Sequence, residues 1–297
     1  MKLKANGLDI EVDDTGGEGR PVVLLIMGLG MQLIAWPDSF VQALVDAGFR
    51  VVRHDNRDIG LSQGFDHAGN ANLVWQTIRQ RLGLQVQSAY TLKDMAKDSL
   101  GVLDALGIER AHIVGASMGG MIAQHIAALA PSRTTSLVSI MSSSGARGLP
   151  GPRREVGAML LRRPAGGSEA ALIAHSLRFI KLIGSPAYPQ DDADITERLT
   201  RSMRRAYRPA GLMRQMVAIG ADAGREKVLP SITSPTLVLH GDADALVPTA
   251  CGEDTARRIP GAKFVAIPGM GHDLPPQAQQ LLLDQMIPFM QAAEVRT

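Results

Sequence analysis

The stretch Ala111-His-Ile-Val-Gly-Ala-Ser-Met-Gly-Gly-Met-Ile122 decides the fold of this chain of 297 residues. Its first four residues form an apolar run typical of a buried strand, and an apolar helical pattern begins at Met118. The turn between strand and helix must be sharp, so the residues two before and two after Ser117 need to be small. They are Gly115 and Gly119. Ser117 is therefore expected to project its hydroxyl above a sheet, at the positive end of a helix.

Short apolar runs alternate with helical patterns along most of the sequence, which is typical of an α/β fold with a mostly parallel sheet flanked by helices. The expected strands are Val22–Ile26, Arg50–Arg53, His112–Val114, Thr135–Ile140, Thr236–His240 and Lys263–Ile267, with Leu8–Val12 pairing antiparallel before them. The expected helices are Phe40–Ala47, one from a capping box at Thr91 to Leu106, Met118–Ala130, Thr249–Arg258 and Gln277–Met290. Pro288 is expected to end or kink the last of these helices.

The alternation breaks between residues 142 and 228. Helical patterns occur there at Ser168–Ile183, Ile195–Arg208 and Leu212–Gly220, without a strand-like run. Residues 147–225 carry 14 Lys and Arg against 7 Asp and Glu, a net charge of +7, and the rest of the chain carries −5. This shift predicts a helical cap at 147–225, inserted into a core formed by 1–146 and 226–297. An arginine-rich solvated surface explains the charge without a specific anionic ligand.

Composition and charge exclude several classes of protein. The formal net charge of +2 gives no support to a nucleic-acid partner. Cys251 is the single cysteine, which excludes an internal disulfide and favours a reducing, cytoplasmic location. No apolar signal region follows Met1. The uncharged runs 21–37 and 111–132 are interpreted as strand-plus-helix segments rather than membrane spans, because the longer one contains polar groups that are costly in lipid.

Two segments after late strands carry acids and a histidine. Gly241-Asp-Ala-Asp-Ala-Leu-Val-Pro248 follows one strand, and Gly269-Met-Gly-His272 follows the next. Together with the Gly115–Gly119 turn, these segments resemble the motifs of the α/β-hydrolase superfamily in the order serine, acid, histidine. The resemblance covers essentially the whole chain. It implies an α/β-hydrolase fold with Ser117 as nucleophile, Asp244 as acid and His272 as base.

Other residues offer alternatives for these roles. Asp242 lies two residues before Asp244, and the family spacing favours Asp244, with Asp242 capping or solvating the turn. Four other histidines lie in or beside strands and helices. We expect them to have packing roles rather than to bind a metal: His54, His112, His125 and His240. Three consecutive serines, Ser142, Ser143 and Ser144, lack the sharp turn and are expected to line the approach to the cap.

The resemblance also implies two backbone N–H donors for a tetrahedral oxyanion, each worth about 2.7–4 kcal/mol. One is the amide of Met118, and the other is the amide of Leu29 in the loop Met27-Gly-Leu-Gly30. A Met-Gly pair in this loop resembles the branch of small carboxylesterases and methylesterases. The segment Asp55-Asn-Arg-Asp-Ile-Gly-Leu-Ser62 resembles the family's Asp-x-Arg-Gly-x-Gly-x-Ser, with Asp58 in place of a glycine. We interpret this segment as structural.

These features predict a serine hydrolase that cleaves carboxylic esters of small molecules through an acyl-enzyme intermediate. Thioesterases, lactonases, acyltransferases and cofactor-free haloperoxidases share the same turn, and a non-catalytic ligand-binding protein on this fold is a further alternative. The cap and residues 65–89, which include Trp75, are expected to set the size of the substrate. The sequence is compatible with a monomer or a homo-oligomer.

Cofactor motifs fail at single positions. A dinucleotide fingerprint starting at Gly28 requires a glycine where Leu33 stands, and a phosphate-binding loop starting at Gly115 requires a lysine where Met121 stands. No organic cofactor and no metal are therefore expected.

Overall fold

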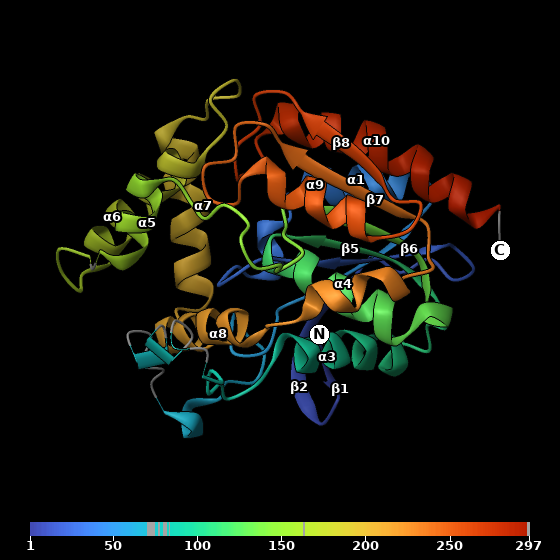
Figure 1. Ribbon diagram of the computed structural model, residues 1–297, viewed down its shortest axis with the longest axis horizontal. Helices are drawn as coiled ribbons and strands as arrows, with labels where there is room; N and C mark the ends of the chain where they lie inside the picture. The colour runs from blue at the N-terminus through green and yellow to red at the C-terminus, as the bar shows by residue number, and fades with distance from the viewer. Residues whose placement is uncertain (70–74, 77, 80–81, 83, 163, 296–297) are drawn as a thin grey trace.

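The computed structural model describes residues 1–69, 75–76, 78–79, 82, 84–162 and 164–295, around an eight-stranded sheet (Figure 1). The strand order is β1-β2-β4-β3-β5-β6-β7-β8. Strands β3 to β8 run parallel, whereas β2 pairs antiparallel with both β1 and β4. The strands are β1 (Lys2–Ala5), β2 (Leu8–Asp14), β3 (Val22–Ile26), β4 (Arg50–His54), β5 (Ala111–Ala116), β6 (Thr134–Ile140), β7 (Thr236–Gly241) and β8 (Lys263–Ile267). The predicted, mostly parallel sheet is confirmed.

Strand β1 is an element that the sequence pattern did not predict. It joins β2 through Asn6 and Gly7, whose φ angles are +48° and +79°. An Asn-Gly pair is typical of the tight hairpin turn that needs positive φ at both central residues. This Asn-Gly dipeptide is the sequence signal that could have indicated the hairpin. The four residues of β1 have mixed exposure and form too short a pattern to identify a strand.

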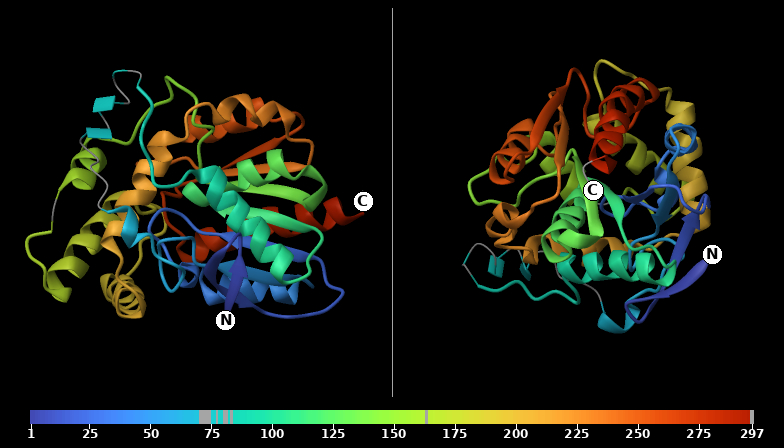
Figure 2. Two further views of the ribbon diagram at one scale, coloured as in Figure 1. Left: turned by 90° about the horizontal axis from the view of Figure 1, so that it is seen from below. Right: turned by 90° about the vertical axis from the view of Figure 1, so that its right-hand side faces the viewer.

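Two layers of helices cover the sheet (Figures 1 and 2). Helices α1 (Asp38–Asp46) and α10 (Pro276–Glu294) pack on one face, and α3 (Leu92–Ala105) and α4 (Met118–Leu129) pack on the other. Helix α9 (Thr249–Arg258) lies against β7 and β8. All five residues of β3 are buried, and its alternate side chains join the two different core clusters. A strand covered on both faces therefore needs a continuous apolar run.

Helix α3 begins where the local sequence predicts, whereas α10 does not end at its internal proline. The capping box of α3 is present, with Thr91 accepting from the Asp94 amide and Asp94 accepting from the Thr91 amide. Pro288 was expected to end or kink α10, but the helix continues through it to Glu294. The buried side of α10 continues past the proline with Met290 and Ala293, so packing outweighs the one backbone hydrogen bond that proline cannot donate.

In the described part of the chain, four α-helices lie between β6 and β7, at one end of the sheet (Figure 1). They are α5 (Arg154–Leu161), α6 (Glu169–Ile183), α7 (Asp192–Arg205) and α8 (Pro209–Ala221). Helix α5 was not predicted, because prolines on both sides obscure its short pattern. Helix α7 ends at Arg205 rather than at Arg208, since α8 begins at Pro209, where a proline suits the first turn. The boundaries of a separate cap unit stay a prediction.

Five single-turn 3₁₀ helices also lie among the described residues: η1 (Leu33–Ala35), η2 (Asp66–Ala68), η3 (Pro131–Arg133), η4 (Arg225–Lys227) and η5 (Leu229–Ser231). The uncharged runs 21–37 and 111–132 each contain a strand followed by a helix, as expected, although the helix in the first run is the single turn η1. Among the described residues, no helix has the length and apolar character needed to cross a bilayer. Parts of the segment 65–89, which was expected to contribute to substrate size, lie outside the described residues.

Candidate active site

Ser117 forms the turn between β5 and α4 and has an unusual backbone conformation, with φ +55° and ψ −120°. A non-glycine residue at positive φ is strained and persists only where its surroundings hold it. Here the Ser117 amide donates to the Ile140 carbonyl (2.9 Å), and the Ser142 hydroxyl donates to the Ser117 carbonyl (2.8 Å). Neighbouring β6 and its following loop therefore hold the serine at the C-terminal edge of the sheet.

The glycines around Ser117 are required by close backbone contacts. A Cβ atom on Gly119 would lie 2.0 Å from the Ile26 carbonyl oxygen, and one on Gly115 would lie 2.1 Å from the Gly119 carbonyl oxygen. Backbone atoms at these distances cannot move aside without shifting β3 or α4. The small residues that the sequence pattern requires on both sides of Ser117 thus have a direct steric reason.

Gly119→Ala is expected to lower the free energy of unfolding by about 3 kcal/mol or more, because the new methyl group overlaps the backbone of β3. Gly157→Ala in α5 is the matched control. Its Cβ would meet nothing nearer than 3.9 Å, so it is expected to raise stability by up to about 1 kcal/mol. Urea unfolding followed by circular dichroism measures both. Equal stabilities of the two variants would contradict the steric explanation.

Three side chains from the ends of three strands form a hydrogen-bonded chain. Ser117 Oγ lies 2.9 Å from His272 Nε2, and His272 Nδ1 lies 2.6 Å from Asp244 Oδ2. Asp244 follows β7 and His272 follows β8. With Asp244 ionised, Nδ1 carries the ring proton and donates it to the carboxylate, which leaves Nε2 as an acceptor for the serine hydroxyl. The three residues that the sequence motifs selected are thus brought together.

The environment of Asp244 keeps its carboxyl group ionised. Burial alone raises the pKa of Asp244, but the charge of His272 and hydrogen bonds from His240, His272 and the Val247 amide outweigh it and hold the pKa well below its usual range. The other carboxylate oxygen accepts from the amides of Leu246 (2.9 Å) and Val247 (2.8 Å). Asp242 points elsewhere and accepts from the Gly269 amide (2.6 Å), so its carboxylate supports the loop before His272.

The end of α6 and the residues after it hold the loop that carries His272. The sequence did not predict this contact. The His272 amide donates to the Ile183 carbonyl (2.7 Å), and the Gly271 amide donates to Ser185 Oγ (2.9 Å). Ser185 donates in turn to the Asp273 carboxylate (2.5 Å). Burial raises the pKa of Asp273 despite these hydrogen bonds. No motif marks Ser185, because its partner lies 86 residues away in the sequence.

The loop Met27–Met31 passes beside the serine. A Cβ atom on Gly28 would lie 3.1 Å from Ser117 Cβ, so only a small residue lets the loop approach this closely. Asn56 Nδ2 donates to the Met27 carbonyl (2.9 Å), and the Gly30 amide donates to Gln215 Oε1 of α8 (2.9 Å). Within the described part of the chain, the amides of Leu29 and Met118 have no protein acceptor. Both are therefore available to a ligand oxygen beside Ser117.

Of the four other histidines that the sequence singled out, His240 lies beside Asp244. Its Nε2 lies 2.7 Å from the Val247 carbonyl and 3.5 Å from Asp244 Oδ2. Burial lowers the pKa of His112 and His125 to about 4, and it also lowers the pKa of His54. These rings have side-chain partners: Ser99 for His54, Ser136 for His112 and Asp222 for His125. Among the described residues, no group of three or more His, Cys, Asp or Glu could hold a metal ion.

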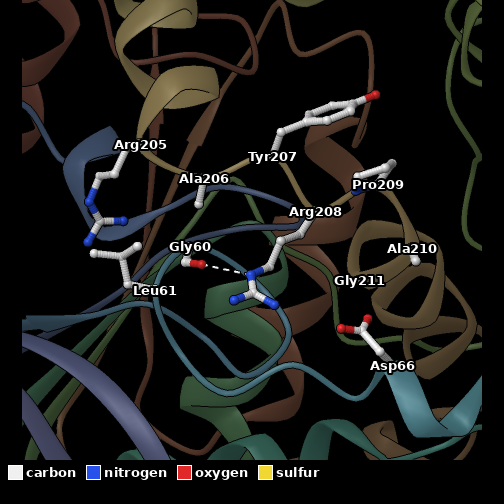
Figure 3. A pocket seen from close by; sticks show the side chains of 10 residues that line it. All are labelled: Gly60, Leu61, Asp66, Arg205, Ala206, Tyr207, Arg208, Pro209, Ala210 and Gly211. Carbon is white, nitrogen blue, oxygen red and sulfur yellow. Dashed lines mark hydrogen bonds between the residues drawn. The ribbon is translucent and has the colours of Figure 1, made fainter. Parts of the chain in front are cut away.

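A groove of about 440 Å³ lies where α7 and α8 meet the loop after β4 (Figure 3). Residues 205–211 form one side, and Gly60, Leu61 and Asp66 form the other. Arg208 crosses it and donates from Nε to the Gly60 carbonyl (2.8 Å). Ser117, Asp244 and His272 do not line this groove.

An α/β-hydrolase has the features described above: this order of strands, a strained turn at the serine, and hydrogen bonds that join Ser117, His272 and Asp244. The chain belongs to this family, because the family model described as alpha/beta hydrolase fold matches residues 21–177, more than half of the sequence. The fold was predicted correctly from the sequence motifs.

Similar proteins match nearly the whole length of the chain. Rhodomycin D methylesterase DauP of Streptomyces sp. (strain C5) is 29% identical, with 94% of this chain and 95% of that protein covered. A putative carbamate hydrolase, RutD of Caulobacter vibrioides (strain NA1000 / CB15N), is also 29% identical, over 97% of both chains. Among solved structures, the enol-lactonase from Burkholderia xenovorans LB400 superposes with a TM-score of 0.71 at 23% identity, over 98% of this chain and 100% of that one. A likeness at this identity shows the fold alone.

Proposed function

We propose that this protein is a serine hydrolase that cleaves carboxylic esters of small molecules through an acyl-enzyme intermediate. The observation that carries the proposal is the continuous hydrogen-bonded chain from Ser117 through His272 to the buried Asp244 carboxylate. A serine hydroxyl is a poor nucleophile at neutral pH unless an adjacent base accepts its proton. In our proposal His272 is that base, and Asp244 holds it in the productive tautomer.

In the acylation step, Ser117 Oγ forms a bond to the ester carbonyl carbon while its proton passes to His272 Nε2. The carbonyl π electrons move to the oxygen, which becomes the tetrahedral oxyanion. When the carbonyl re-forms, the bond to the alcohol oxygen breaks, and His272 returns the proton to that oxygen. The products of this step are the free alcohol and an ester between the substrate's acyl group and Ser117.

In the deacylation step, water takes the place of the alcohol. His272 removes a proton from the water as its oxygen attacks the acyl carbon, and a second oxyanion forms. Collapse of this intermediate breaks the bond to Ser117 Oγ, which recovers its proton from His272. The carboxylic acid leaves and the serine is restored, so the two steps balance without a cofactor or a metal.

We assign the backbone amides of Met118 and Leu29 as donors to the oxyanion. The Met118 amide follows the nucleophile and begins α4, where the unpaired N–H groups and the helix dipole favour negative charge. The Leu29 amide lies in the loop that approaches Ser117 most closely at Gly28. Donors that are already fixed before the reaction stabilise the developing charge without reorganisation.

One relative supports ester substrates. It is a methylesterase, 29% identical over 94% of this chain, and by analogy we propose an ester of a small alcohol such as methanol. The test compares p-nitrophenyl acetate, butyrate and octanoate with a thioester and a lactone of matched acyl length. Ester turnover well above thioester and lactone turnover is the expected result. Turnover of the thioester or lactone alone would replace the proposal with one of those reactions.

We further propose that residues 147–225 act as a cap that sets acyl size, with Leu212 of α8 as a wall of the acyl site. A Cβ on Gly30 would lie 2.6 Å from Leu212 Cδ1, so this side chain sits directly on the loop beside Ser117. Leu212→Ala is expected to raise the octanoate-to-acetate ratio of kcat/KM several-fold, since one methylene in an apolar pocket changes binding by about 1–3 kcal/mol. Leu129→Ala, exposed at the far end of α4, is the control. An unchanged ratio in Leu212→Ala would remove Leu212 from the acyl site.

The biological setting is proposed from composition alone. The single cysteine and the near-neutral charge favour a cytoplasmic enzyme that acts on small molecules rather than on nucleic acid.

A further inference from the structure

Gln215 of α8 joins the inserted helices to two loops of the sheet domain. Its side chain is fully buried. Its Oε1 accepts from the Gly30 amide (2.9 Å), and its Nε2 donates to the Arg57 carbonyl (3.0 Å). One amide side chain thus ties the loop beside Ser117 to the loop after β4. Both of its hydrogen bonds go to backbone atoms, so they fix the course of the main chain.

The bond to Gly30 fixes the peptide next to the Leu29 amide. On one side of Leu29, the Met27 carbonyl is held by Asn56 (2.9 Å). On the other side, the Gly30 amide is held by Gln215, and the turn closes through a bond from the Met31 amide to the Gly28 carbonyl (3.2 Å). The peptide that carries the Leu29 N–H lies between these anchors. The orientation of this peptide therefore depends on both anchors being made.

Helix α8 is itself seated by a buried ion pair. Arg214, the residue before Gln215, donates two hydrogen bonds to Asp58, from Nε (2.6 Å) and from Nη2 (2.7 Å). Asp58 also accepts from the Phe65 amide and the Tyr90 hydroxyl. Both charged side chains are at most 3% exposed. Gly211 completes the contact, because a Cβ there would lie 2.0 Å from the Asp58 carbonyl oxygen.

The conformation of Asp58 explains its place in the sequence motif. Its φ is +74°, in the left-handed region that favours glycine, and a glycine stands at this position in the family pattern that the segment resembles. Asp tolerates this region better than most side chains. Here it adds a carboxylate that receives Arg214. The departure from glycine therefore supplies the contact that fixes α8 over the loop beside Ser117.

We propose that Gln215 is a positioning residue for the oxyanion loop, held in place by the Asp58–Arg214 pair. This inference rests on the proposed function, because it assigns the Leu29 amide an oxyanion to bind. On this account α8 is part of the catalytic framework as well as a cover for the site. Gln215 touches no reacting atom; it acts by holding the Gly30 amide.

The test measures steady-state kinetics on p-nitrophenyl butyrate and the inhibition constant of butaneboronic acid. The boronic acid forms a bond from boron to Ser117 Oγ while the serine proton passes to His272 Nε2, and the boron becomes a tetrahedral anion that reports on oxyanion binding. Gln215→Met removes both hydrogen bonds at similar volume. Gln215→Glu keeps an oxygen toward the Gly30 amide and, as a protonated acid, places an O–H donor toward the Arg57 carbonyl. Gln279→Leu is the matched control. This buried glutamine of α10 also makes two side-chain hydrogen bonds, to Ser39 and the Leu274 carbonyl.

Gln215→Met is expected to lower kcat about 10- to 100-fold and to raise the inhibition constant of butaneboronic acid by a similar factor. KM is expected to change less than about threefold. Gln215→Glu is expected to recover most of the kcat, and Gln279→Leu to keep it within about twofold. If Gln215→Met does not fold, Gln215→Asn is measured instead, since its shorter side chain cannot span both partners and the same kcat loss is expected.

Two failures are distinguishable. A wild-type protein that hydrolyses no ester contradicts the proposed function. An active wild type together with a folded Gln215→Met, or Gln215→Asn, whose kcat and boronic acid affinity stay within twofold overturns the positioning role alone. A loss confined to KM also overturns it, because a displaced oxyanion donor acts on the transition state.

Discussion

Ser117→Ala is expected to lower kcat for p-nitrophenyl butyrate by about 10⁴- to 10⁶-fold. Removal of the hydroxyl leaves only the oxyanion donors and substrate binding to accelerate attack by water, and losses of this order accompany removal of the nucleophile in other serine hydrolases. KM should change little, because the hydroxyl contributes little to ground-state binding. The rate is measured as p-nitrophenolate release, by stopped-flow or steady-state absorbance, and is corrected for background hydrolysis.

The control for this variant is Ser143→Ala. Ser143 lies in the run of three serines after β6, and its hydroxyl accepts from the Gly145 amide (3.1 Å) rather than facing His272. This variant is expected to retain activity within a few-fold. Thermal unfolding of both variants checks that the fold is intact. A Ser117→Ala protein that keeps a tenth or more of wild-type kcat would contradict the assignment of the nucleophile.

Asp244→Asn is expected to lower kcat by about 10³- to 10⁴-fold while leaving the position of His272 nearly unchanged. An asparagine can present an N–H to His272 Nδ1, which stabilises the tautomer whose Nε2 carries the proton and cannot accept one from Ser117. The neutral side chain also removes the charge that stabilises the imidazolium during the reaction. Measurement of kcat and KM for both p-nitrophenyl acetate and butyrate separates this loss from a change in binding.

Asp242→Asn distinguishes the two acids of the same loop. The Asp242 carboxylate accepts from the Gly269 amide and has no contact with His272, so its replacement by an isosteric amide is expected to cost less than about tenfold in kcat. A larger loss in Asp242→Asn than in Asp244→Asn would reverse the assignment that the 2.6 Å contact between His272 and Asp244 supports.

The sequence was informative wherever function depended on short, local geometry. The glycines at 115 and 119, the strand before Ser117 and the helix after it predicted the turn, since only small residues fit beside the backbone of β3. The family spacing favoured Asp244 over Asp242, and the structure brings Asp244 beside His272. Strands buried on both faces could be located because they are continuous apolar runs.

The contacts between the inserted helices and the sheet domain could not be predicted. Gln215 lies 185 residues from Gly30, and Ser185 lies 86 residues from Gly271, so no local pattern connects these pairs. A buried glutamine on a helix also has the same sequence appearance as an exposed one. The single clue was Asp58, a charged residue at a position where the resembling motif has glycine. It indicated an ordered loop but not its partner, Arg214.

Covalent labelling with diethyl p-nitrophenyl phosphate, followed by peptide mass spectrometry, tests whether Ser117 is the nucleophile. We expect one p-nitrophenolate to be released per chain, one diethylphosphoryl group to be found on Ser117, and esterase activity to fall in proportion to labelling. Prior binding of butaneboronic acid should protect the site. A label on any residue other than Ser117, such as Ser142, Ser143 or Ser144, would contradict Ser117 as the nucleophile. Full esterase activity in a protein that carries the diethylphosphoryl group on Ser117 would also contradict it.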